Sequence, residues 1–468
     1  MPCFMFLPAF ANLFGLGGSS LISRCLGSED SEKARHTAAF CIWTGIVVAF
    51  LYGIAILLLE PMLFPILGAK AETWDYLRQY VFWTIGIGAV PTVMNAEFAH
   101  LIRSEGYSRQ AGFGVALGGV LNIALDPLFI FVFRLNIAGA AIATMLSNVI
   151  AMLYIVGFLL RIRKKSVITL NPTLYSVRYK IPSEVITVGL PGFVMTMMST
   201  ISNTALNHMV AGYSNTAIAG MGIAKKIDLL AYAIAQGMTQ GTLPLISYNY
   251  SSGNLDRMKD AIKTAFAYSL IVAACGTVLL YFFAAPIAGS FISDAETVRY
   301  GQHFLKIICL ACPTTAVNFM CITVFQAIGK KVQPLFLSLL RKGSLDTVFM
   351  LLLNERMGVS GIAWATPFAD WIAFMISIAL VVPYLKKLNV NSKIALQAGS
   401  RHLLRLHPSK SSNISIFEQS EAYSRISCCT LRSFAVTSFT NELLSFRHTL
   451  SCPCRSFLNS LFYRTVCI

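Results

Sequence analysis

Charged side chains are scarce in this sequence. Asp, Glu, Lys and Arg together make up 12% of the 468 residues, whereas hydrophobic residues make up 56%. Long apolar runs take the place of the mixed segments of soluble domains and of the ten-residue alternation of a membrane barrel, so both classes are excluded. The chain also lacks a glycine-rich phosphate-binding motif and paired groups for hydrolysis, phosphoryl transfer or redox catalysis. We therefore expect a helical membrane protein that is not an enzyme.

Metal-binding patterns are missing as well. Cys309 and Cys312 form a CxxC pair, but they lie inside an apolar run where packing is the expected role. The paired cysteines near the end of the chain lack the ligand spacing of a zinc site. The net charge of +16 comes from cations spread over loops, which explains membrane orientation and headgroup contact without a nucleic-acid partner. We predict no metal and no cofactor.

Eleven apolar segments are long enough to cross a membrane, which takes roughly 20 residues as a helix. We place them near residues 1–23, 38–67, 77–101, 111–133, 137–160, 185–212, 217–248, 261–293, 302–328, 333–354 and 359–384. The predicted fold class is therefore an all-α integral membrane protein.

Motifs in the first half of the chain return about 222 residues later. Pro91 has its counterpart in Pro313, Asn95 in Asn318, and Asp126 in Asp346. Six helices separate equivalent points, so the two halves share one orientation and form a parallel repeat. Such a duplicated bundle predicts a transporter with its substrate path between two lobes.

The repeat and the changes in composition divide the chain into four regions. We predict an N-terminal lobe at 1–165, a basic cytoplasmic linker at 166–184, a C-terminal lobe at 185–388, and an atypical tail at 389–468 that is disordered or read out of frame. The lobes then hold five and six helices, and a helix that should precede residue 1 is missing from the pattern. Because Lys and Arg are concentrated in alternate loops, we expect a multi-pass protein of the plasma membrane whose C-terminus is cytoplasmic.

Three stretches carry a resemblance to a known family. They are residues 10–24 with Gly27, residues 121–131, and residues 240–250. In this order they resemble the multidrug and toxic compound extrusion (MATE) family over roughly residues 9–388. The resemblance implies twelve helices in two lobes around a central cavity, with export of amphipathic, often cationic compounds driven by inward flow of H+ or Na+.

Two other functions stay open. One is a flippase for lipid-linked oligosaccharides, which would show several cations lining its cavity. The other is a truncated, non-transporting product. For the exporter we expect small-molecule substrates, contact with membrane lipids and a monomeric state.

Asp126 is the preferred cation-coupling residue. Ionisable groups at membrane depth are costly and therefore point to function. Asn122 lies one helical turn earlier on the same face, where its amide can orient the carboxylate. Pro127 frees a backbone carbonyl as a further acceptor. The Asn122 and Asp126 pair resembles the family's N-terminal cation site, so we expect H+ coupling there.

The remaining polar residues at membrane depth are weaker candidates. Lys342 lies one turn before Asp346, which predicts a neutralised pair, and Lys225 and Asp228 are expected to pair with each other. Na+ coupling through the seventh and tenth family helices is disfavoured, because no convincing carboxylate lies there. The candidates for the substrate cavity are Glu97, Asn95, Asn203, Gln240, Asn318 and Asp370.

Overall fold

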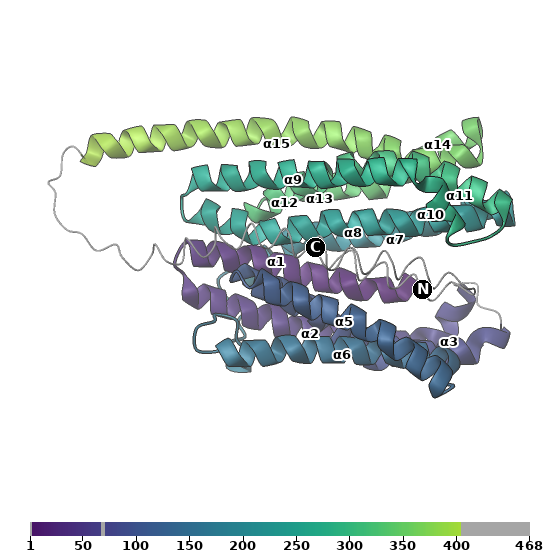
Figure 1. Ribbon diagram of the computed structural model, residues 1–468. Coiled ribbons are helices and arrows are strands. Elements are labelled where there is room, and N and C mark those ends of the chain that lie inside the picture. The colour runs from purple at the N-terminus through teal and green to yellow at the C-terminus, as the bar shows by residue number, and fades with distance from the viewer. Residues whose placement is uncertain (1, 67–70, 404–468) are drawn as a thin grey trace, which may run out of the picture.

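The structure is a computed structural model that describes residues 2–66 and 71–403, and all regular structure in these ranges is helical (Figure 1). The α-helices are α1 (Phe6–Gly27), α2 (Ser31–Ile66), α3 (Trp74–Val81), α4 (Ala89–Ser104), α5 (Ser108–Pro127), α6 (Asn136–Ile162), α7 (Ile181–Ala211), α8 (Asn215–Ser251), α9 (Leu255–Phe282), α10 (Ala284–Gly289), α11 (Ala295–Ile308), α12 (Cys312–Ala327), α13 (Val332–Ser338), α14 (Asp346–Met357) and α15 (Val359–Leu403). Three π-helical segments interrupt them, namely η3 (Phe82–Ile87), η4 (Leu128–Val132) and η7 (Leu339–Leu345).

Continuous runs of these helices match the predicted apolar segments in number and order. Within the described ranges, eight helices are long and apolar enough to cross a membrane, and the number is nine when the bent pair at 74–104 is counted as one span. The two remaining runs are α8 and the run from α13 to α14, and both carry charged side chains between their ends. The predicted all-α membrane fold is confirmed.

Helix breaks lie next to three prolines. The run from α3 through η3 to α4 bends by 46°, and Pro91 is the third residue after the break. Pro313 is the second residue of α12, directly after the short 3-10 turn Cys309–Ala311. Pro127 ends α5, and η4 follows it. Proline removes a backbone donor and clashes with the preceding turn, which explains why each helix restarts there.

The helices form two groups that meet along α1. Helices α2 to α6 lie on one side of α1, whereas α7 to α15 lie on the other (Figure 1). Small residues allow α1 and α7 to approach closely, because a Cβ atom added to Gly17 would lie 2.1 Å from the Val185 carbonyl oxygen. At the end of this contact, Glu184 forms ion pairs with Lys33 at 2.9 Å and with Arg24 at 3.7 Å.

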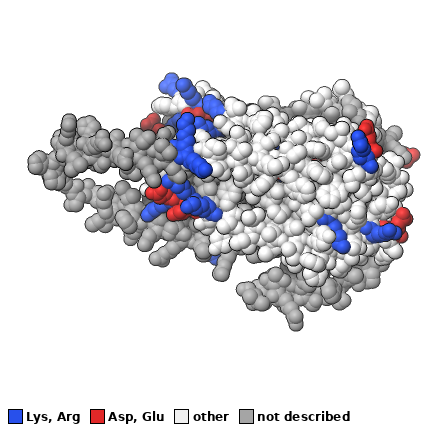
Figure 2. Space-filling view, turned by 90° about the horizontal axis from the view of Figure 1, so that it is seen from above, with Lys and Arg blue, Asp and Glu red and all other residues white. Residues whose placement is uncertain are grey.

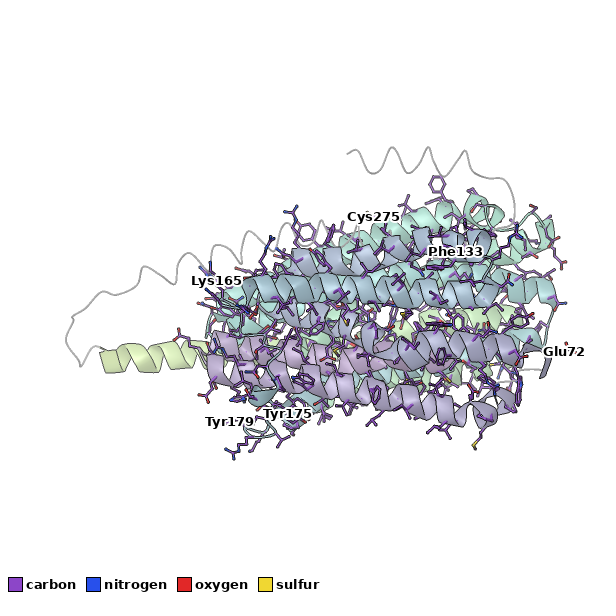
Figure 3. All side chains as sticks on the ribbon, turned by 90° about the horizontal axis from the view of Figure 1, so that it is seen from below. Glu72, Phe133, Lys165, Tyr175, Tyr179 and Cys275 are labelled. Carbon is purple, nitrogen blue, oxygen red and sulfur yellow. The ribbon has the colours of Figure 1, made fainter. Side chains whose placement is uncertain are left out.

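Lys and Arg gather at one end of the bundle (Figure 2). The segment between α6 and α7 lies at this cation-rich end, as Lys165, Tyr175 and Tyr179 show, whereas Glu72 and Phe133 lie at the opposite end (Figure 3). Helix α15 continues to Leu403, past residue 388 where the C-terminal lobe was predicted to end. The rest of the predicted tail, residues 404–468, lies outside the described residues.

Candidate functional site

A chain of polar side chains links three helices of the N-terminal half. Asn95 of α4 donates to the Asn148 amide oxygen at 3.2 Å, and Asn148 of α6 donates to the Thr144 carbonyl at 3.0 Å. From the other side, the Asn122 amide lies 3.3 Å both from the Thr144 hydroxyl and from an Asp126 carboxylate oxygen. The structure therefore brings together three predicted residues, Asn95, Asn122 and Asp126. Their cluster is called the N-lobe site below.

Local helix geometry places Asp126 at a break. Asp126 is the penultimate residue of α5, and Pro127 and η4 follow it. Only 8% of Asp126 is exposed. A π-helical turn leaves backbone carbonyls without their usual partners and is frequent at functional sites. A buried carboxylate with a neighbouring amide and freed carbonyls can hold a proton or a small monovalent cation.

The C-terminal half repeats these contacts at equivalent positions. Asn318, the counterpart of Asn95, donates to the backbone carbonyl of Asp370 at 3.1 Å. Asp370 in turn is the counterpart of Asn148. Lys342 donates to Asp346 at 3.3 Å, at the positions equivalent to Asn122 and Asp126. The same distance thus joins the equivalent side chains in both halves, and the predicted pairing of Lys342 with Asp346 is confirmed.

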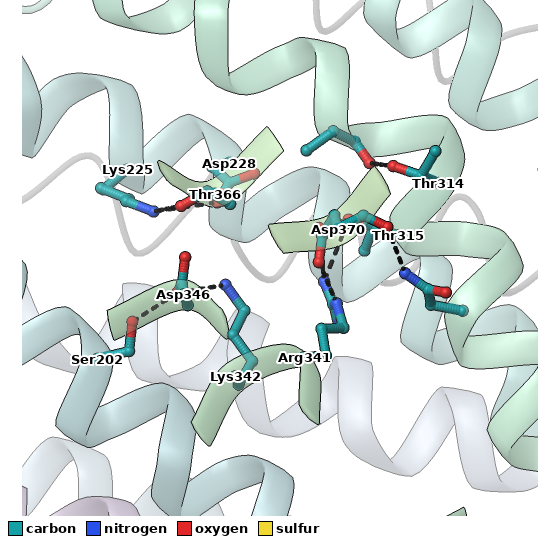
Figure 4. Close-up of polar contacts among 12 residues, drawn as sticks. Ser202, Lys225, Asp228, Thr314, Thr315, Arg341, Lys342, Asp346, Thr366 and Asp370 are labelled. Atoms are coloured by element: carbon teal, nitrogen blue, oxygen red, sulfur yellow. Dashed lines mark hydrogen bonds and ion pairs between the residues drawn. The ribbon is translucent and has the colours of Figure 1, made fainter. Parts of the chain in front are cut away.

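This second cluster contains more charged side chains than the N-lobe site (Figure 4). It is called the C-lobe network below. Arg341 binds Asp370 through two nitrogens, at 2.5 and 3.1 Å, and Thr315 also donates to that carboxylate. The Ser202 hydroxyl donates to Asp346 at 2.5 Å. The network's third ion pair joins Lys225 to Asp228 of α8 at 3.9 Å, and Lys225 also contacts Thr366.

Glu97 lies apart from both clusters. Its side chain is fully buried, and neither carboxylate oxygen has a hydrogen-bond partner among the described residues. It faces α2, where a Cβ atom added to Gly45 would lie 2.2 Å from a Glu97 oxygen. An unpaired buried carboxylate is costly when ionised. Glu97 is therefore suited to carry a proton.

The other two cavity candidates occupy separate places. Gln240 of α8 accepts from Arg103 of α4 at 3.3 Å and so bridges the two halves. Asn203 is exposed on α7, one residue after the buried Ser202. The structure does not bring Asn203 or Gln240 to either cluster.

Sequence reasoning missed Arg341 altogether and gave no role to Thr144. Arg341 is among the largest fully buried side chains of the described residues. The sequence did contain a signal for Arg341. It lies next to Lys342 in the middle of a predicted membrane segment, where charged side chains are costly and point to function. Thr144 could have been found as the counterpart of Thr366 in the repeat.

The duplicated bundle with an equivalent polar site in each half defines the class of the protein: a membrane transporter built from repeated helical lobes. The family model described as MatE matches residues 1–128 and 191–352. The chain belongs to this family, whose members are transporters and not enzymes, as the sequence predicted.

Curated relatives cover most of the chain. The protein is 28% identical over 397 residues to "Multidrug export protein MepA" of Staphylococcus saprophyticus, which covers 85% of this chain and 87% of the relative. It is 27% identical over 392 residues to the protein of that name from Staphylococcus aureus strain MSSA476, with 84% of this chain and 86% of the relative covered.

Solved structures share the fold. One is described as the outward-facing conformation of a multidrug resistance MATE family transporter, with a TM-score of 0.77, 24% identity, and coverage of 82% of this chain and 86% of that chain. Another is the Vibrio cholerae MATE transporter VcmN in the bent form, with a TM-score of 0.74, 20% identity, and coverage of 83% and 88%.

Proposed function

We propose that this protein is a multidrug exporter of the cell membrane that couples the outward movement of amphipathic, often cationic compounds to the inward movement of H+ through Asp126. The proposal rests on one observation: the Asp126 carboxylate is buried and lies at the end of the hydrogen-bonded series of side chains in the N-lobe site. The names of the relatives, multidrug export proteins, support the substrate class.

H+ is preferred over Na+ as the coupling ion for a chemical reason. Na+ needs several oxygen ligands, whereas the described partners of Asp126 include an amide nitrogen of Asn122, which repels a cation if it keeps its present orientation. A proton needs only the carboxylate itself. Water stabilises a charged carboxylate, so opening of the site to water would let the proton leave.

The two halves are expected to rock against each other along α1, so that the N-lobe site faces each side of the membrane in turn. The protein would act as a monomer surrounded by lipid. We place the cation-rich end in the cytoplasm, because Lys and Arg are retained there. A cysteine at Lys165 should then be protected from a membrane-impermeant maleimide in intact cells, and one at Glu72 should be labelled.

The proposal is tested with Asp126→Asn, which keeps the size of the side chain and removes its charge. We expect loss of ethidium export in cells and loss of ethidium-dependent H+ movement in proteoliposomes. Asp75→Asn is the matched control, because Asp75 is exposed in the first turn of α3. Unchanged export by Asp126→Asn at equal surface amounts contradicts the coupling role. A requirement for a Na+ gradient instead of a pH gradient would correct the ion but keep the site.

An oligosaccharide flippase would need free cations to hold a diphosphate-linked substrate. The three cations of the C-lobe network, Arg341, Lys342 and Lys225, are each paired with a carboxylate. This pairing favours the exporter.

A further inference from the structure

The two halves place different chemical groups at one and the same position. In the N-lobe site an amide, Asn122, lies 3.3 Å from the Asp126 carboxylate. In the C-lobe network an ammonium group, Lys342, lies 3.3 Å from the Asp346 carboxylate. Both contacts join residues four apart in the chain. A π-helical segment begins two residues after Asp126, and Lys342 lies within another that ends directly before Asp346. The polar geometry is therefore shared, and the charge is what differs.

The C-lobe network balances its own charge. It contains three cations, Lys225, Arg341 and Lys342, and three carboxylates, Asp228, Asp346 and Asp370. In the first half, the counterparts of Arg341, Lys342 and Asp370 are the uncharged Leu121, Asn122 and Asn148. Three charges have thus been added around a carboxylate that both halves retain.

Asp346 has the features of a cation ligand. Its side chain is 1% exposed, and one oxygen accepts from Lys342 and Ser202. The other oxygen has no hydrogen-bond partner among the described residues. A buried carboxylate with a vacant oxygen requires a compensating positive charge. Lys342 supplies that charge from the same helical run, so no ion from solution is needed.

We propose, on the basis of the coupling role proposed for Asp126, that the C-lobe network is a second cation site of the same design whose cation is the tethered ammonium group of Lys342. Lys342 holds the place that H+ or Na+ would take, and the transporter couples through one lobe only. Replacement of Lys342 by Asn restores the amide found in the first half. It leaves the network with one unbalanced negative charge, and this charge opens Asp346 to an external cation.

The experiment uses a hydrophobic carbodiimide, which modifies carboxyl groups that carry a proton, on the purified full-length transporter. Mass spectrometry then identifies the modified peptides. In the wild type we expect no modification of Asp346, because the Lys342 ammonium group already provides its counter-charge. In Lys342→Asn we expect modification of Asp346 that is lost as the pH rises, and Na+ should protect against it if the opened site also accepts Na+.

The charged groups around Asp346 could respond to the substitution. They are Lys225 of α8 with its partner Asp228, and Arg341 of η7 with its partner Asp370 of α15. Lys225 is the other lysine whose charge acts on Asp346, and an Asp346 that Lys225 keeps unmodified in Lys342→Asn would contradict the claim that Lys342 alone holds the cation position. Lys342→Arg is the matched control, because it keeps the positive charge and should leave Asp346 unmodified. Comparable elution from size exclusion and comparable melting temperatures show that each variant is folded.

Two results overturn the proposal: modification of Asp346 in the wild type, or its absence in folded Lys342→Asn. Modification of Asp126 is read in the same sample and tests the N-lobe site separately. An unmodified Asp126 together with a modified Asp346 in Lys342→Asn would contradict the coupling role of Asp126 and leave the proposal for Asp346 in place. A further readout is the number of H+ moved per substrate in proteoliposomes, which should rise in Lys342→Asn if the opened site takes part in the cycle.

Discussion

Gly189 of α7 lies against the backbone of Leu13 of α1, so closely that a Cβ atom added to Gly189 would lie 1.8 Å from the Leu13 carbonyl oxygen. No side chain fits this space, because the neighbouring atom is backbone and cannot rotate away. The contact joins the two halves of the transporter. Gly189 therefore sets how closely the lobes can approach along α1.

Gly189→Ala should separate α1 from α7 and destabilise this arrangement of the lobes by about 1–3 kcal/mol, the usual cost of an overpacked contact. We expect a lower melting temperature in detergent and reduced drug export. Gly157→Ala is the matched control, because nothing lies within 4 Å of a Cβ atom at Gly157. Equal losses in the two variants would show that the lobe contact is not the cause.

Thr144→Val should weaken the N-lobe site without removing its carboxylate. The Asn122 amide would lose the Thr144 hydroxyl at 3.3 Å and would hold Asp126 less firmly. A neutral hydrogen bond contributes about 1 kcal/mol, so we expect about a fivefold change in apparent H+ affinity. The pH dependence of export reports this change. Asn122→Ala combined with Thr144→Val should be less than additive, since both act through the same amide, and full additivity would contradict the chain of contacts.

Most of the fold could be predicted from the sequence because the apolar runs and the repeat are both long-range signals. The pairing of Lys342 with Asp346 followed from helical spacing alone, and Asp126 with Asn122 followed in the same way. Contacts between helices could not be predicted so directly. Spacing along one helix does not show that Asn95 reaches Asn148, or that Asn203 points outward while the adjacent Ser202 points inward.

Arg341 is a second example of a contact between helices that the sequence did not predict. Its partner Asp370 lies on a different helix, 29 residues away. Spacing along one helix therefore predicts the pair of Lys342 with Asp346 but not the pair of Arg341 with Asp370.

Glu105 at the cation-rich end makes a prediction about pH. It accepts hydrogen bonds from Ser166 and from the backbone of Val167 and Ile168, which anchor the start of the linker between the halves. Burial raises the pKa of Glu105 above its ordinary value, although these hydrogen bonds oppose the shift. The unfolded chain therefore loses this proton first as the pH rises.

Stability from Glu105 should consequently be greatest at low pH and should fall as the pH rises from the unfolded pKa to the raised folded pKa. Glu105→Gln cannot titrate, so its melting temperature should fall less across this window than that of the wild type. Melting curves recorded from about pH 4 upward measure the difference. Parallel curves for the two proteins would show that Glu105 does not contribute to the pH dependence.

Substitution of Glu97 should affect transport but not folding. Since neither of its oxygens has a hydrogen-bond partner among the described residues, the uncharged Glu97→Gln should fold as well as the wild type. Export should fall if the carboxyl group carries a proton or offers its negative charge to the cationic substrate, because an amide can do neither. Surface amount and ethidium export measure the two properties. Asn95→Ala is a useful comparison, because it affects the N-lobe site but leaves Glu97 in place, and full export by Glu97→Gln would assign Glu97 to packing.

The ion pair between Arg341 and Asp370 can be tested by replacing both residues with those at the equivalent positions of the first half. Arg341→Leu alone leaves the Asp370 carboxylate buried without its cation, and Asp370→Asn alone leaves the guanidinium group without its anion. Each single change should destabilise the protein by about 3–5 kcal/mol. The double variant carries the residues of the first half, Leu121 and Asn148, at both positions, so most of the lost stability should return. Melting temperatures of the four proteins in detergent close the cycle. A double variant as unstable as the sum of its parts would mean that the C-terminal half needs these two charges for more than their mutual compensation.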